Sequence, residues 1–228
     1  MKSLIIVLVF ILALTACAPA PNPAQQETQN VSPQTHTPPV VAAAPAEPAS
    51  VAEPSNSDAA TRIAGNPVLQ ALTTSFSARN FMPGEIPHYD IEAILLSGAR
   101  AQSARNAQPW RFTVVTNYAD VRQMHGGAAE GNIVVIISGR IDNALQTTDF
   151  DCGIAAAYMQ IAAESLGYGA RMLVSPVNMI EQRRADFDIP GGYRVVMAII
   201  IGTAEDAVDG FASATPRNPL SEIVNWAS

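Results

Sequence analysis

The feature that most restricts how this chain can fold is a proline-rich tract near its N-terminus. Residues 18–60 hold nine of the 17 prolines, contain no Lys, Arg or aromatic residue, and consist largely of Ala, Pro, Glu, Gln and Ser. Such a segment buries too little apolar surface to offset the entropy lost on folding, and its prolines favour an extended chain. We therefore expect a disordered tether up to residue 60 and one folded domain over residues 61–228.

The residues before the tether have the features of a secretory leader. A short basic start is followed by an apolar run of 11 residues, Leu4–Leu14, which is too short to span a bilayer comfortably. The following LTAC motif, residues 14–17, resembles a bacterial lipobox. We expect residues 1–16 to be a lipoprotein signal peptide and Cys17, the first residue of the tether segment 17–60, to be lipidated. An ordinary secretory signal or an uncleaved anchor is the alternative.

A lipidated Cys17 would attach the protein to a membrane of the cell envelope, facing outside the cytoplasm in the periplasm or at the outer surface. Ala18 follows the Cys, where many lipoproteins kept in the inner membrane have Asp, and this weakly favours the outer membrane. If Cys17 is lipidated, Cys152 has no disulfide partner. Its position in the apolar sequence DFDCGIAAAYM favours a buried core residue over a redox thiol.

The charges of the domain argue against nucleic acid as a partner. The domain contains 12 Arg against 16 acidic residues, and Lys2 is the only lysine of the chain. Every fixed cation available to a ligand is therefore a guanidinium, whose planar donors suit phosphate. The three His, at positions 36, 88 and 125, are not spaced as metal ligands, so we expect no metal site.

Helices and strands alternate along the domain. Continuous apolar runs indicate strands buried on both faces, and spacings of three and four indicate helices. An N-cap and first-turn proline mark one helix start, and a capping-box-like pair marks another. Helices are predicted from Asn66-Pro67, from near Asp90, over residues 149–166 and from Asn178 with Glu181; strands are predicted over residues 111–116, 132–138, 170–174 and 193–202. The layout indicates an α+β or α/β domain with a central sheet.

Three polar motifs are candidates for function. They are SFSARNF (residues 75–81), SARNAQPWRF (103–112) and TPRNPLSEIV (215–224). The amides of the second motif suit a heterocycle that carries both carbonyl and ring N–H groups. Taken singly, each motif is also compatible with a solvated helix end, a polar connection or a surface Arg.

Together and in this order, the motifs resemble the nitroreductase family of FMN-dependent oxidoreductases. The resemblance extends over about residues 65 to 226, and Asn-x-Gln-Pro-Trp is its most specific element. The matching segments are Ser77–Phe81, Asn106–Phe112, Asp151–Ala156, Leu166–Gly169, Gly192–Tyr193 and Arg217–Val224.

The resemblance implies an α+β, three-layer, dimeric fold, with a central and mostly antiparallel sheet flanked by helices. It implies FMN as the cofactor. Ser77 and Arg217 would lie at the phosphate, and Arg79 at the ribityl chain or the pyrimidine end of the ring. Ser103, Asn106 and Gln108 would serve the flavin of the same chain or of the partner in a homodimer. The backbone N–H of Ser175 would face the hydride-accepting nitrogen.

The chain departs from the family pattern at two points. The family's leading phosphate Arg falls here at Ser75 or Phe76. Relatives often place a backbone N–H from a Glu-Gly or Gly-Gly pair against the hydride-accepting nitrogen. This chain has Ser175-Pro176 there, and because proline has no N–H, only Ser175 could donate. No side chain is needed as a general acid or base, because the flavin carries the hydride, so no catalytic residue is nominated.

We therefore expect a lipid-anchored, FMN-dependent oxidoreductase that reduces a small electron-poor acceptor, such as a quinone or nitro compound. Its electron donor outside the cytoplasm is an open question. The main alternative is a non-catalytic flavin-binding or interaction lipoprotein that keeps the dimeric fold. A fold relative that dehalogenates a substrate or fragments flavin is a third possibility, without a positive signal.

Overall fold

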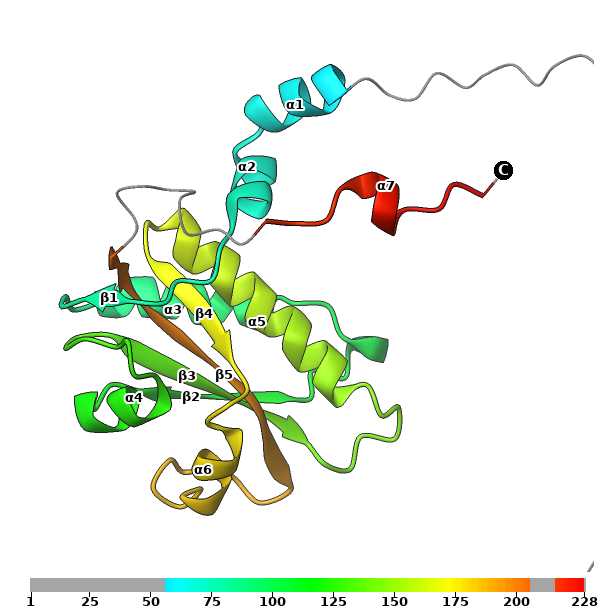
Figure 1. The fold of residues 1–228 in the computed structure, drawn as a ribbon. Helices are drawn as coiled ribbons and strands as arrows, with labels where there is room; N and C mark the ends of the chain where they lie inside the picture. Colours follow the sequence, from blue (N-terminus) through cyan, green and yellow to red (C-terminus); the bar gives the residue numbers. More distant parts are fainter. Residues whose placement is uncertain (1–55, 206–215, 228) are drawn as a thin grey trace, which may run out of the picture. The chain divides into compact units, whose positions relative to one another are not determined.

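The computed structural model describes residues 56–205 and 216–227 (Figure 1). The predicted signal peptide, Cys17 and the tether up to residue 55 lie outside the described residues. In chain order the elements are α1 (Asn56–Ala64), α2 (Pro67–Thr74), β1 (Phe81–Met82), α3 (His88–Ala99), the 3-10 helix η1 (Ala104–Asn106), β2 (Trp110–Val115), α4 (Tyr118–Met124), β3 (Ile133–Arg140), α5 (Thr148–Ser165), β4 (Gly169–Leu173), α6 (Val177–Gln182), β5 (Tyr193–Ala204) and α7 (Leu220–Ile223).

The two helices at the start of the described chain test the predicted boundary and the predicted cap. Helix α1 begins at Asn56, so helical structure starts before residue 60, where we placed the end of the tether. The composition of its sequence NSDAATRIA explains this, since it has no proline, three alanines and an acidic first turn. Helix α2 confirms its predicted start, because the Asn66 side chain accepts hydrogen bonds from the Val68 and Leu69 N–H groups at 3.0 and 3.1 Å.

Strand β5 organises the sheet because three other strands pair with it, all antiparallel. β3 pairs with β5 from Ile133 opposite Ile201 onward, and β4 pairs with it from Gly169 opposite Gly202 onward. Both partners use the same stretch of β5, so they lie on opposite edges of it. β1 pairs with the last two residues of β5, and β2 pairs with the outer edge of β3.

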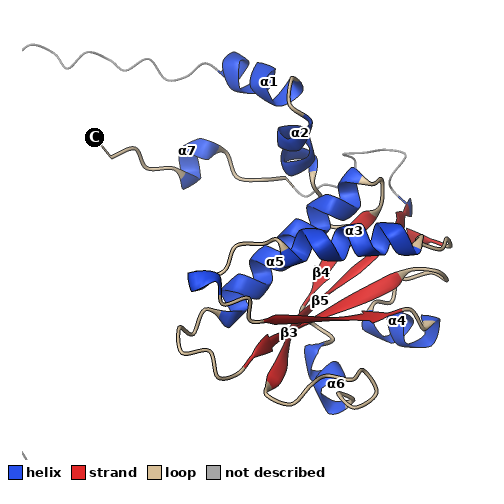
Figure 2. Cartoon of the chain, turned by 180° about the vertical axis from the view of Figure 1, so that it is seen from behind, coloured by secondary structure: helices blue, strands red, loops and turns tan. Residues whose placement is uncertain are grey.

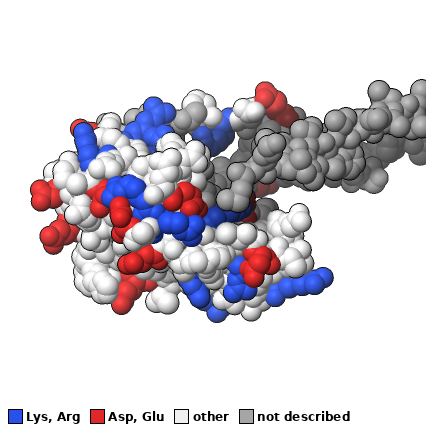
Figure 3. All heavy atoms as spheres, turned by 90° about the horizontal axis from the view of Figure 1, so that it is seen from below, with Lys and Arg blue, Asp and Glu red and all other residues white. Residues whose placement is uncertain are grey.

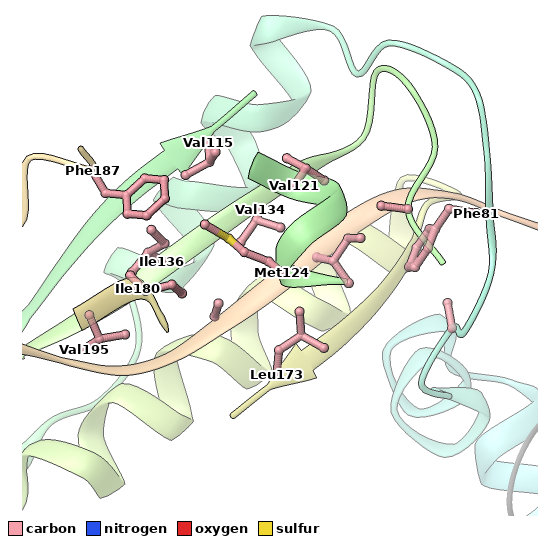
Figure 4. Packing of buried hydrophobic residues seen from close by; sticks show 14 of the residues in the cluster. Phe81, Val115, Val121, Met124, Val134, Ile136, Leu173, Ile180, Phe187 and Val195 are labelled. Carbon is pink, nitrogen blue, oxygen red and sulfur yellow. The ribbon is translucent and has the colours of Figure 1, made fainter. Parts of the chain in front are cut away.

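Helices cover both faces of this sheet (Figure 2). Successive β3 side chains point to opposite faces: Val134 and Ile136 join the core cluster that includes α4 and α6, shown in Figure 4. Val135 and Ile137 join the cluster on the face of α3 and α5. The continuous apolar run of β3 is thus buried on both sides, as its pattern predicted. The structure confirms the predicted α+β fold with a mostly antiparallel sheet between helices.

Helix α5 packs closely on α3 and on β3 because small residues line the contact. A Cβ atom at Gly98 would overlap the Met159 side chain, and one at Gly139 would overlap Thr148. Ala155, Ala156 and other small residues of α5 are fully buried against the sheet. The alanine run of α5 therefore brings the helix and sheet backbones close together.

Local signals failed at several elements. The predicted capping box of α6 is wrong, because Pro176 is the N-cap residue and no side chain caps this helix. Glu181 instead accepts a hydrogen bond from the Val195 N–H and forms an ion pair with Arg184. The contact with β5 thus takes the place of the predicted cap. The short strand β1 and helix α4 were not predicted, since two to seven residues carry too little periodicity.

Within the described part of the chain, no helix is long and apolar enough to cross a membrane.

The environment of Cys152 predicts an unreactive thiol. Its side chain is fully buried in α5, and burial, followed by the charges of Asp149 and Asp151, raises its pKa to about 12. We expect iodoacetamide at pH 8 to leave Cys152 unmodified in the folded protein and to modify it after unfolding in urea, because only the thiolate reacts. Peptide mass spectrometry separates it from Cys17. Rapid alkylation of Cys152 in the native state would contradict this packing.

Candidate functional site

The amide-rich connection before β2 is held in one conformation by its own hydrogen bonds. The Ser103 hydroxyl accepts a hydrogen bond from the Gln108 N–H at 3.0 Å. The Gln108 side-chain amide donates to the Asn106 side-chain oxygen at 3.0 Å, and the Asn106 N–H donates to the Ser103 carbonyl. The structure therefore brings these three sequence-predicted residues together. The side chains of Asn106 and Gln108 are exposed, which leaves the other half of each amide group facing outward.

A buried carboxylate fixes this loop to the start of α5. Asp151 is 1% exposed. Its Oδ1 accepts a hydrogen bond from the Ala104 N–H at 3.1 Å, and its Oδ2 accepts one from the Thr147 hydroxyl at 2.8 Å. Asp151 stands in the first turn of the helix, where the helix dipole favours negative charge. The sequence showed Asp151 as part of a motif without revealing this supporting role.

The same loop holds backbone strain. Arg105, Asn106 and Gln108 have φ angles of 52°, 55° and 43°, in the left-handed region that side-chain-bearing residues rarely adopt. Each such residue costs on the order of 1 kcal/mol and persists only where surrounding contacts hold it. Strain of this kind concentrates at functional sites, and here it falls on the amides that the motif singled out.

The second group of predicted residues lies on the extended segment between α2 and β1. Phe76 and Ala78 pack against the core cluster of α4 and α6, and the Ala78 N–H donates to the Ala170 carbonyl of β4 at 3.1 Å. Ser77 and Arg79 alternate with these core residues, so their exposed side chains point to the other side of the segment. The structure thus places Ser77 and Arg79 next to each other beside the start of β4.

A polar cluster stands at the beginning of this segment, where the family pattern has an Arg. The Ser75 hydroxyl donates to the Glu164 carboxylate at 3.0 Å, and the Gln160 side-chain amide donates to the same carboxylate at 2.9 Å and to Ser75 at 3.0 Å. Burial raises the pKa of Glu164 above its usual value, while hydrogen bonds from Gln160, Ser75 and the Phe76 backbone oppose this shift. Sequence motifs did not identify this cluster, because Ser75 and Glu164 are far apart in the chain.

Strand β4 links Ser77 to the position of Ser175. Ser175 follows the end of β4 and is exposed, and Pro176 is buried as the N-cap of α6. Ser175 lies five residues after Ala170, which is about 16 Å in an extended chain. Ser77, Arg79 and Ser175 therefore lie along one edge of the domain.

The amide loop lies at the other end of the sheet. Ala170, which accepts the hydrogen bond from the segment of Ser77, is paired with Ile201 of β5. The amide loop leads into Trp110, which is paired with Gly139 of β3. Gly139 is in turn paired with Arg194 of β5. Ile201 lies seven residues after Arg194, which is about 23 Å along the strand, and β2 and β4 are three strand spacings apart, about 14 Å across the sheet. Ser77 and Arg79 are thus not brought together with the amide loop within one chain, whereas Ser175, beyond the end of β4, lies toward the amide-loop end of the sheet.

Other basic side chains occur near Ser77 and Arg79. Burial lowers the pKa of His125, and the positive charges of Arg171 and Arg122 lower it further. Arg171 follows Ala170 in β4 and was not predicted, because a single Arg in a strand gives no pattern. Arg217 lies on the described C-terminal segment just before α7, with an exposed side chain. On the face seen in Figure 3, Arg and acidic side chains are interspersed rather than separated into patches of one sign.

Comparison with known sequences gives consistent matches. The sequence model of the nitroreductase family matches residues 74–136, which include both groups of site residues up to Gln108. A protein of Methanothermobacter thermautotrophicus, provisionally named NADH dehydrogenase/NAD(P)H nitroreductase, is 33% identical over 133 residues, covering 54% of this chain and 70% of the relative. A protein of Archaeoglobus fulgidus with the same provisional name is 28% identical over 162 residues, covering 66% of this chain and 93% of the relative.

Solved structures share the fold. A nitroreductase with bound FMN from Bacteroides fragilis superposes with a TM-score of 0.60 at 20% identity, covering 72% of this chain and 100% of that one. A nitroreductase with bound FMN from Desulfitobacterium hafniense gives a TM-score of 0.58 at 19% identity, covering 72% and 99%. The relative from Methanothermobacter thermautotrophicus is more than 30% identical to this chain, and the match covers more than two thirds of that relative. This chain therefore belongs to the nitroreductase family.

Proposed function

We propose that this protein is an FMN-dependent oxidoreductase that reduces a small electron-poor acceptor, such as a quinone or a nitro compound, through bound flavin. The observation that carries the proposal is the strained amide loop of residues 103–108, which presents exposed donors and acceptors in a family whose solved members contain FMN. The provisional names of the sequence relatives, which refer to NADH and nitro compounds, support the same reaction class.

The residues along β4 fit the parts of the cofactor. Ser77 and Arg217 would hold the phosphate, since hydroxyl and guanidinium groups are good donors to phosphate oxygens. The stretch of about 16 Å from Ala170 to Ser175 matches the scale of an extended flavin nucleotide. Arg79 would contact the ribityl chain or the pyrimidine end of the ring, where its charge stabilises reduced flavin. Ser175 would direct its N–H to the hydride-accepting nitrogen.

When bound, FMN supplies the hydride transfer, and the protein supplies position and polarity. Pro176 cannot add a second N–H donor near Ser175. The side chains of this site therefore bind and orient, and none of them needs to move a proton.

The opposite positions of the two groups favour a homodimer with shared sites. About 23 Å along the sheet and 14 Å across it separate the amide loop from the Ser77 end of β4, where the phosphate would lie, so Ser103, Asn106 and Gln108 would serve the flavin of the partner subunit. Apolar side chains exposed on three helices are available for the subunit contact. They are Val68 and Leu72 on α2, Tyr89 and Leu96 on α3, and Phe150 and Tyr158 on α5.

Attachment to a membrane through Cys17 remains part of the proposal, and it determines the electron donor. A protein anchored outside the cytoplasm would receive electrons from a membrane or periplasmic carrier instead of NAD(P)H. We expect cells fed a labelled palmitate analogue to label the protein and Cys17→Ala to remove the label. Label retained by the variant would contradict lipidation at this residue.

A non-catalytic flavin-binding lipoprotein is the second candidate. Two observations favour it: the family's leading phosphate Arg is replaced here by Ser75 or Phe76, beside the Ser75–Gln160–Glu164 cluster, and Pro176 removes a backbone donor near the ring. A binder of this kind would retain the fold and the amide loop without reducing an acceptor.

The visible spectrum of the purified protein tests both candidates. We expect a yellow protein that releases FMN, loses its flavin absorbance when a donor is added, and recovers it with a quinone or nitro acceptor. If no physiological donor, such as a quinol or a reduced carrier, bleaches the flavin absorbance, the result favours the non-catalytic binder. A colourless protein that does not take up FMN would contradict both candidates.

The anchoring of the amide loop gives a second test. We expect Asp151→Ala to weaken FMN binding by about tenfold or more, because the Ala104 N–H and the Thr147 hydroxyl lose their acceptor and the strained loop relaxes. Asp149→Ala is the matched control: it removes a carboxylate from the same helical turn, but one that pairs with Arg194 at the surface. Titration of flavin fluorescence measures both. Equal FMN affinity in wild type and Asp151→Ala would contradict the proposal that Asp151 holds the loop in its flavin-binding conformation.

A further inference from the structure

We propose that Glu164 sets the flavin preference of this protein by repelling the phosphate group of FMN. The preference for FMN over riboflavin would then be smaller than in a site that has an Arg in place of Ser75. This inference rests on the proposed function, because it takes the phosphate to lie at Ser77. It concerns a carboxylate that the sequence motifs do not include and whose place in the site only the fold shows.

The first step is that Glu164 is on the same side of the segment as the proposed phosphate position. Phe76 and Ala78 point into the core, so Ser75 and Ser77 both point away from it. Ser75 bonds to Glu164 at 3.0 Å. Residues two apart in an extended chain are about 7 Å apart, and the carboxylate lies one hydrogen bond beyond Ser75, so it is within about 10 Å of Ser77.

The second step is that Glu164 receives hydrogen bonds that favour its ionised form, although burial has the larger effect and raises the pKa of its carboxyl. Its Oε1 accepts hydrogen bonds from the hydroxyl of Ser75 and the amide of Gln160. Gln160 is itself only 9% exposed, and it is held by the Phe76 carbonyl at 3.4 Å as well. Donors that converge on one oxygen position a negative charge, although burial works against the charge.

The third step concerns the size of the effect. The screening length of physiological salt is about 8 Å, so over about 10 Å the repulsion between a carboxylate and a phosphate is only partly screened, and partial burial weakens the screening further. A relative with Arg in place of Ser75 would add attraction where this chain adds repulsion. Riboflavin lacks the phosphate and is otherwise the same molecule, so the ratio of the two dissociation constants isolates this interaction.

The experiment is a fluorescence titration of the flavin-free full chain with FMN and with riboflavin at pH 7.5, for wild type and Glu164→Gln. We expect Glu164→Gln to tighten FMN binding by about tenfold and to leave riboflavin binding unchanged. Ser75→Arg should shift the ratio in the same direction, and it keeps the proposal testable if Glu164→Gln does not fold. Asp188→Asn, which removes an exposed carboxylate outside the site at a position where Asn tolerates the positive φ of 49°, should leave the ratio unchanged.

A ratio that stays constant in Glu164→Gln and Ser75→Arg would overturn the inference while leaving FMN binding established. The same holds if both flavins gain or lose affinity together, since that would indicate a purely structural role for the cluster. Failure of every variant to bind either flavin would instead overturn the proposed function itself.

Discussion

Antiparallel pairing along both edges of β5 is the constraint on which the rest of the structure depends. The strand has 12 residues; β3 pairs with its residues 193–201 and β4 with its residues 198–202. Their register fixes which side chains reach each core, and it also fixes the positions of the polar segments. The amide loop lies at the end of the sheet where Trp110, Gly139 and Arg194 are paired. The segment of Ser77 lies at the end where Ala170 is paired with Ile201. The length of one strand therefore separates the two halves of the candidate site.

Helix α5 connects these two halves. Its first turn holds Asp151, which accepts hydrogen bonds from the amide loop, and its last turns hold Gln160 and Glu164, which bond to Ser75. Between them, small buried residues press the helix against the sheet. Its 18 residues extend about 27 Å, which is close to the separation of the two groups. The helix thus acts as a rigid spacer that sets where each half of a shared site can lie.

The sequence predicted elements whose signals are local or strongly periodic. The buried strand β3, the long helix α5 and the Asn66 cap were found because apolar runs, spacing and cap chemistry specify them. The loop residues Asn106 and Gln108 were found through a motif, but their left-handed backbone was not, since neither residue type requires it. Contacts between distant residues, such as Ser75 with Glu164 or Glu181 with Val195, leave no local pattern and needed the fold.

The central claim is that each flavin site combines the Ser77 edge of one chain with the amide loop of another. Mixed dimers test it directly. Arg79→Ala impairs one half of every site, and Asn106→Ala with Gln108→Ala impairs the other, so each variant alone should lose FMN. If sites are shared, co-refolding equal amounts of the two should restore bound FMN to about a quarter of the sites, because a two-fold mixed dimer has one intact site. If mixing restores no flavin although mixed dimers form, each site belongs to one chain and the account is contradicted.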